Sequence, residues 1–163
     1  MRGTEELRRG LVRYLAGAGV AAVAAWPGEG RAPAGQAVAA VSLRACSGGP
    51  PGFQDYLGER YDEAAGRWEE LYGKKVRLTF GLDLYAATAA QVQEGLDALT
   101  AALARGGPEG LRPVAFSAGE TVWRKEAGRY FCPVQAEFEA WSYAVTGEDG
   151  AFLDFAVRGE SRG

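Results

Sequence analysis

Hydrophobic and polar residues alternate along the chain over residues 76–85. The apolar positions are Val76, Leu78, Phe80, Leu82 and Leu84, and the positions between them are Arg77, Thr79, Gly81, Asp83 and Tyr85. Side chains of a β-strand point alternately to the two sides of a sheet. The pattern therefore predicts a long strand with one face in the core and one exposed, mixed polar face.

Two helices are predicted from apolar stripes at helical spacing. One follows the long strand directly, where Thr88 and Gln91 are spaced as a capping box and the stripe ends before Gly106. This stripe consists of Val92, Leu96, Leu99 and Leu103. The other helix lies near the N-terminus, with Thr4 as its expected cap. Its stripe consists of Leu7, Leu11 and Leu15.

The remaining segments are predicted to be mostly strands and loops. Strands are expected over 20–26 and about 37–46, with a Pro- and Gly-rich loop over 27–35 and a second loop over 47–57. Two long strands are expected over 111–146, and Pro133 in the second indicates an edge or a bulge. The alternately buried positions there are Val134, Ala136, Phe138 and Ala140. A last short strand near Phe152 and a frayed C-terminal end follow.

Two segments share the same turn pattern. Glu-Ala precedes Gly-Arg-aromatic in RYDEAAGRWEE, which begins at Arg60, and in WRKEAGRYFC, which begins at Trp123. We interpret each as a hairpin in which a type I turn is followed by a glycine with positive φ, Gly66 in the first and Gly128 in the second. Two copies indicate repeated turn chemistry rather than a duplicated domain.

These elements predict a single domain, residues 1–163, of the α+β class. We expect a mainly antiparallel sheet with two helices packed on one face and a protruding hairpin arm over about residues 50–73. A chain of 163 residues with 47% hydrophobic composition can bury one sizeable core. Its apolar runs are too short for a membrane helix, and it has no signal-peptide pattern. We therefore expect a soluble protein made in the cytoplasm.

Composition and motifs limit the chemistry that the chain can perform. Without a histidine, Ser/His/Asp triads and His-ligated metals are excluded, and a net charge of −3 provides no general attraction to nucleic acid. Cys46 and Cys132 have no metal or redox spacing, so we expect free thiols packed as small hydrophobic groups. Glu137 and Glu139 could form an acid–base or magnesium pair, although a solvated outer face is the favoured interpretation. We predict no catalytic residue, cofactor or metal.

Aromatic residues gather on the predicted arm. They are Phe53, Tyr56, Tyr61, Trp68 and Tyr72. Such side chains contribute a large contact area for few rotatable bonds and are enriched in protein interfaces. Either the arm forms an interface or it folds back onto its own domain. Around Trp123, basic and aromatic residues are interleaved as in single-strand nucleic-acid binders, but cross-strand pairs in a hairpin are the favoured interpretation.

Two blocks of sequence carry a resemblance to a known family. LYGKKVRLTFGLDLYA, the capped helix after it and LRPVAFSAGETVWRKEAGRYFCPVQAEFEAWSYAV resemble the tail terminator, or tail-completion, proteins of phages and prophages from Gram-positive bacteria. The similarity covers about residues 5–145. It implies a subunit that forms a ring, commonly a hexamer, on the end of the tail tube, stops tube growth and joins the tail to the head. The loop over 47–61 and the strand near Phe152 depart from the shortest members.

The resemblance also implies partners and a location. The partners would be further copies of the chain, the tail tube and head-completion proteins, in a virion tail assembled in the bacterial cytoplasm. DNA would only pass through the lumen, where carboxylates would keep it from adhering, and no membrane would be involved. The predicted interface residues are Tyr56, Tyr61, Trp68, Arg77 and Asp83. The alternatives are a head–tail connector, a head-completion or baseplate protein and, less favoured, a carboxylate-dependent enzyme.

Overall fold

The computed structural model describes residues 2–24, 35–49, 56–146 and 152–158, which form two helices and one sheet of nine strands. The elements, in chain order, are α1 (Arg2–Gly17), β1 (Ala21–Val23), β2 (Val38–Gly49), β3 (Tyr56–Asp62), β4 (Arg67–Ala86), α2 (Ala89–Ala104), β5 (Arg112–Ala118), β6 (Val122–Arg124), β7 (Arg129–Cys132), β8 (Val134–Thr146) and β9 (Phe152–Arg158). The predicted α+β class is confirmed.

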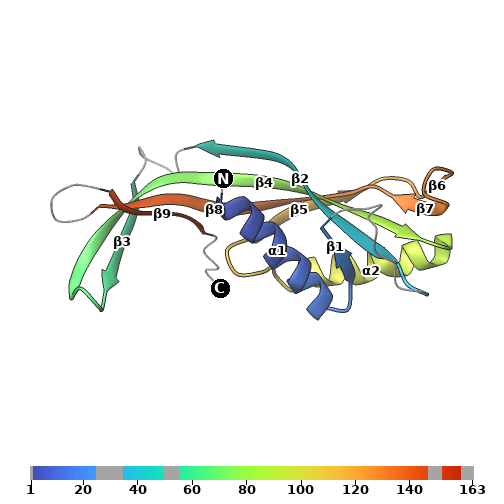
Figure 1. The fold of residues 1–163 in the computed structure, drawn as a ribbon, viewed down its shortest axis with the longest axis horizontal. Helices are drawn as coiled ribbons and strands as arrows, with labels where there is room; N and C mark the ends of the chain where they lie inside the picture. Colours follow the sequence, from blue (N-terminus) through green and yellow to red (C-terminus); the bar gives the residue numbers. More distant parts are fainter. Residues whose placement is uncertain (1, 25–34, 50–55, 147–151, 159–163) are drawn as a thin grey trace.

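Strand β4 is the centre of the sheet (Figure 1). Along one edge it pairs with β3 and then β2, and along the other with β8 and then β7, always antiparallel. β5 and β9 extend the sheet beyond β8, β6 pairs with β7, and β1 pairs with β2 in the only parallel ladder of the described strands. A 20-residue strand at the centre makes the molecule elongated.

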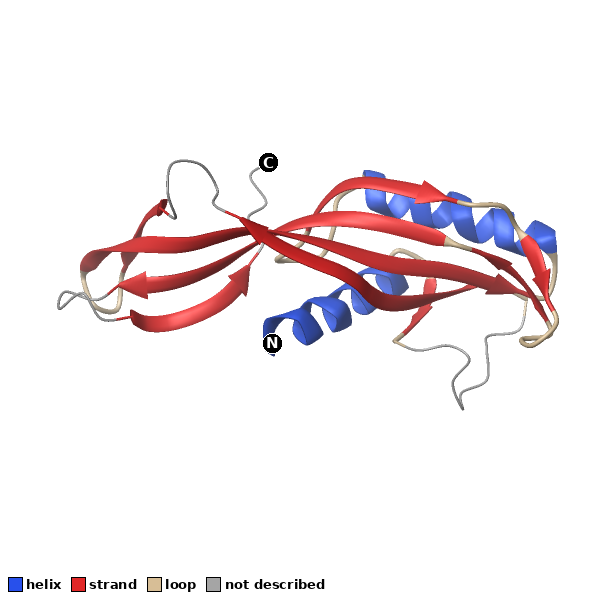
Figure 2. Cartoon of the chain, turned by 90° about the horizontal axis from the view of Figure 1, so that it is seen from above, coloured by secondary structure: helices blue, strands red, loops and turns tan. Residues whose placement is uncertain are grey.

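Both helices pack on the same face of the sheet and cover only part of its length (Figures 1 and 2). The helix residues of the core are Leu7, Leu11, Leu15, Val92, Leu99, Ala102 and Leu103, and they meet the alternate positions 76–84 of β4 and 134–140 of β8. Phe80 and Phe138 meet edge to face there, with ring centroids 5.8 Å apart. Each such large side chain contributes roughly 1.5–3 kcal/mol of burial free energy. The predicted alternation and both helical stripes are confirmed.

The remainder of the sheet forms an arm, which we define as β3, residues 67–74 of β4, residues 141–146 of β8, and β9. The β3–β4 hairpin of the arm projects beyond the helices at one end of the molecule, whereas β9 runs back toward α1 (Figure 1). The predicted hairpin with Gly66 at positive φ is confirmed, with φ of 66°. The arm is broader than predicted, because β8 and β9 continue the sheet alongside this hairpin.

Several predicted boundaries are corrected. Thr4 lies inside α1, which begins at Arg2, and so is not the N-cap. β2 continues to Gly49 and β3 begins at Tyr56, so residues 47–49, 56 and 57 of the predicted loop are strand, because β4 supplies pairing partners for both strands, and residues 50–55 lie outside the described part of the chain. The two long strands predicted over 111–146 are each interrupted, the first between β5 and β6 and the second at Pro133, which has no N–H to donate. The Gly119 N–H donates to the Pro133 carbonyl at 2.8 Å and so connects the two interruptions. Predictions for 27–34, Phe53 and the C-terminal end lie outside the described residues.

Candidate functional site

Tyr61 and Trp68 are exposed aromatic side chains near the tip of the arm. They are direct partners across β3 and β4 and meet edge to face, with ring centroids 5.4 Å apart. Tyr61 is 50% exposed and Trp68 67%. The turn between them is fixed by Asp62, whose carboxylate accepts hydrogen bonds from the N–H groups of Ala64 and Ala65. A rigid turn therefore presents an aromatic pair to solvent.

Alternation along β4 places Trp68 on the same side of the sheet as Leu78 and Phe80, the side that the helices cover in the core. The exposed pair thus lies on the helix-bearing side of the sheet but beyond the end of the helices, and the exposed side chains of Glu70 and Lys74 separate it from the apolar core positions of β4. For Tyr61 and Trp68, exposure argues against an arm that folds back onto its own domain. The side chain of the third predicted arm residue, Tyr56, lies outside the described part of the structure.

On its other side the arm is held by an ion pair. Nε of Arg60 on β3 lies 3.0 Å from Oε2 of Glu69 on β4, and Glu69 is almost completely buried. Breaking a pair by removing one partner is costly when the remaining charge is buried. This pair therefore stabilises the hairpin that carries the aromatic residues.

Arg77 lies farther along β4, on the face without helices, where it joins a network around Glu139. The Glu139 carboxylate lies 2.9 Å from Lys75, 3.3 Å from Arg77 and 3.9 Å from Arg112. The hydrogen bond from Lys75 is the main cause of a lowered pKa for Glu139. Glu139 is therefore held ionised and is a poor proton donor near neutral pH, which argues against the acid–base role considered for Glu137 and Glu139.

The prediction that Asp83 is exposed on this face of β4 is wrong. Asp83 is only 9% exposed, because its Oδ2 accepts a hydrogen bond from Arg44 at 2.7 Å and its Oδ1 accepts one from the Val134 N–H at 3.2 Å. The second bond satisfies a backbone donor where the ladder is interrupted at Pro133. Asp83 thus stabilises the junction between β4 and the start of β8.

The contact of Arg44 with Asp83 was not predicted from the sequence. The register of β2 shifts between Leu43 and Ala45, which leaves Arg44 as the extra residue of a bulge and allows its side chain to reach across β4. It lies over Gly81, where a Cβ atom would collide with its guanidinium group. A glycine inside a predicted strand often marks such a close approach, and this was the signal available in the sequence.

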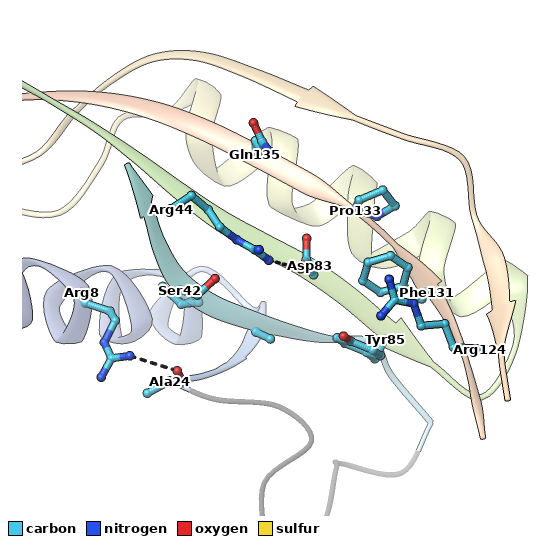
Figure 3. Close-up of a pocket in the computed structure, with 12 residues that line it drawn as sticks. Arg8, Ala24, Ser42, Arg44, Asp83, Tyr85, Arg124, Phe131, Pro133 and Gln135 are labelled. Atoms are coloured by element: carbon cyan, nitrogen blue, oxygen red, sulfur yellow. Dashed lines mark hydrogen bonds and ion pairs between the residues drawn. The ribbon is translucent and has the colours of Figure 1, made fainter. Parts of the chain in front are cut away.

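A partly open pocket of about 750 Å³ lies over this region (Figure 3). Its walls include Arg8 of α1, Arg44, Asp83 and Tyr85 of β2 and β4, and Arg124 of β6, residues far apart in the sequence. The ring of Tyr85 packs against Phe131 at 5.1 Å, and the Arg124 guanidinium lies 3.8 Å from the centre of the Phe131 ring. Burial raises the pKa of Tyr85, while the charges of Arg124 and Arg44 oppose this shift.

The two cysteines occupy different environments. Cys132 is buried as predicted, whereas Cys46 lies in the exposed part of β2, residues 43–48, which corrects its predicted burial. Among the described residues, no group of three or more His, Cys, Asp or Glu side chains could hold a metal ion. No described helix is both long enough and apolar enough to span a membrane.

Comparison of the sequence with known proteins returned no matching protein family and no curated protein with significant similarity. The surfaces described above are therefore the basis of the functional interpretation. Of the predicted interface residues, the structure brings Tyr61 and Trp68 together on the arm, whereas Arg77 and Asp83 lie farther along β4, in an ion-pair network and at a buried junction respectively.

Proposed function

We propose that the chain is a structural subunit of a phage or prophage tail, which forms a ring on the end of the tail tube, terminates the tail and joins it to the head. The observation that carries the proposal is the exposed Tyr61–Trp68 pair on an arm that projects beyond the helices. Exposed aromatic pairs of this kind are typical of the energetically dominant residues in protein interfaces. Its partners would be other copies of the chain, the tail tube and head-completion proteins.

The edges of the arm support an assembly role as well. Within the described residues, β3 pairs only with β4, and β9 only with β8, so each has one edge without a strand neighbour. Unpaired strand edges can add a strand from another chain. An elongated subunit with an interaction surface at one end suits heterologous contacts, which close into a ring when the rotation between copies permits it. The sequence resemblance to tail terminators points in the same direction.

The proposal is tested in a phage that lacks this gene. Electron microscopy should show overlong tails or tails without heads, and the wild-type gene supplied in trans should restore normal particles. Trp68→Ala should fail to restore them, with at least about a tenfold loss of infectious particles, because an interface hot spot is worth about 2 kcal/mol or more. The isolated variant should keep its melting temperature, since Trp68 is largely exposed.

Trp123→Ala is the matched control. Trp123 is also exposed, by 54%, and also packs edge to face against a tyrosine, Tyr130, at 5.0 Å, but it lies on the β6–β7 hairpin and not on the arm. It should restore normal particles. If Trp68→Ala restores normal particles as fully as Trp123→Ala does, the aromatic pair of the arm is not part of the assembly surface. Tails of normal length, joined to heads, in the absence of the gene would refute the proposed function itself.

A further inference from the structure

The tip of the arm is acidic and slender. Residues 56–72 contain five acidic side chains and two arginines. At the turn, Asp62 is engaged with the backbone, and Glu63 is exposed next to Ala64 and Ala65, whose side chains are also exposed and small. Within the described residues, Glu63 forms no ion pair. The tip therefore presents a carboxylate on a narrow turn that can enter a concave surface.

The pocket at the other end of the sheet has the opposite charge. Three arginines and one aspartate line it, and the aspartate, Asp83, is already engaged by Arg44 and a backbone N–H. Arg8 is paired with Glu5 at 2.9 Å. Arg124 is exposed, and its described contact is with the face of the Phe131 ring rather than with a carboxylate. The pocket thus offers a positive charge that no described acidic side chain of the same copy neutralises.

The two surfaces belong to opposite ends of one continuous sheet (Figure 1), so the tip of the arm does not meet the pocket of its own copy. We propose that the acidic tip of the arm, led by Glu63, docks into the arginine-lined pocket of a neighbouring copy and meets Arg124 there. This contact joins two different surfaces and is therefore heterologous, as a ring requires. The inference rests on the proposed function and specifies which surfaces of the subunits meet.

Charge reversal in the full-length chain tests the contact. Sedimentation velocity over a range of concentrations should show self-association of the wild type, which Glu63→Arg or Arg124→Glu alone should weaken at least about tenfold, because like charges brought together in an interface are strongly unfavourable. The double variant, Glu63→Arg with Arg124→Glu, restores opposite charges and should associate within about threefold of the wild type.

Two controls separate this contact from general charge effects. Lys125→Glu makes the same charge change one residue from Arg124 but outside the pocket, and Glu126→Arg reverses an acidic residue at the tip of the other hairpin. Both should leave association within about threefold of the wild type, beyond the weak effect of net charge. The inference would be overturned if the wild type stays monomeric or if Glu63→Arg and Arg124→Glu weaken association no more than the control variants do. It would also be overturned if the double variant does not recover association. If tails are nevertheless terminated normally by Arg124→Glu, only this contact fails and the proposed function stands.

Discussion

Replacing Gly81 by alanine should displace Arg44 from Asp83. Gly81 is the direct partner of Ser42 across β2 and β4 and lies beneath the Arg44 side chain. A methyl group at this position would overlap Nε of Arg44 and would come within 2.9 Å of the Ser42 hydroxyl. Gly81 is not among the glycines with positive φ, so the backbone itself accepts alanine. The main obstruction is therefore the guanidinium group, which must leave Asp83 to make room, whereas the Ser42 hydroxyl can move away by a change of rotamer.

The expected cost follows from two opposing terms. A hydrogen bond to a charged group contributes about 1.5–3 kcal/mol, and the lower end applies because the Arg44 side chain is 49% exposed and partly screened by water. Alanine is favoured over glycine within a strand by about 0.5–1 kcal/mol, since it loses less backbone entropy on folding. The free energy of unfolding should therefore decrease by about 1 kcal/mol in Gly81→Ala.

Urea unfolding of four proteins provides the assay: the wild type, Gly81→Ala, Arg44→Ala and the double variant. In the Arg44→Ala background only the Ser42 hydroxyl remains close, and a change of its rotamer moves it away, so the same glycine-to-alanine change should increase the free energy of unfolding by about 0.5–1 kcal/mol. The effect of the substitution thus changes sign with the residue at position 44, which a double-mutant cycle measures directly. If Gly81→Ala has the same effect in both backgrounds, the interpretation of Gly81 as the seat of Arg44 is refuted.

Two further predictions concern single titratable groups. In the folded protein a thiol reagent should modify Cys46 rapidly and Cys132 only on unfolding, because Cys132 is 1% exposed and burial raises its pKa; rapid modification of Cys46→Ser would contradict this. The pKa of Glu139 is lowered from 4.5 by Lys75, so its stabilising effect is complete above that pH and is lost as the pH falls through the lower folded-state pKa. Glu139→Gln should therefore lose less stability than the wild type over this range in urea unfolding, and identical pH profiles would exclude the effect.

The regular parts of the fold were predictable because one strong local pattern determined each of them. Burial on a single face of β4 requires the alternation seen over 76–84, and the stripe of α2 requires helical spacing. The length of β4 was not predictable in this way. Its first residues, 67–70, are polar or aromatic and carry no such alternation, and they are strand because β3 pairs with them and, from Glu70 onward, β8 does as well. Long-range pairing, which local pattern does not encode, sustains the arm.

The pocket could not be predicted from the sequence for a related reason. Arg44 and Asp83 are 39 positions apart, and their contact depends on a one-residue shift in the β2–β4 register. Such a bulge moves a side chain to a new position without a change in composition. The wrong prediction for Cys46 also arose because the sequence does not show which part of a strand is covered by other elements. The hydrophobic character of cysteine favoured burial, yet Cys46 lies in the part of β2, residues 43–48, in which every residue is exposed.

Two positions on the central strand β4 relate the fold to the proposed assembly. Trp68 and Phe80 occupy the same side of β4, yet Trp68 is 67% exposed and Phe80 is fully buried. Their position in the strand alternation is the same, but the helices extend over Phe80 and not over Trp68, and the exposed residues Glu70 and Lys74 lie between them on that side of β4. Burial of a large indole group is favourable by roughly as much free energy as burial of a core side chain. A second chain that covers the arm would therefore supply at Trp68 what the helices already supply at Phe80.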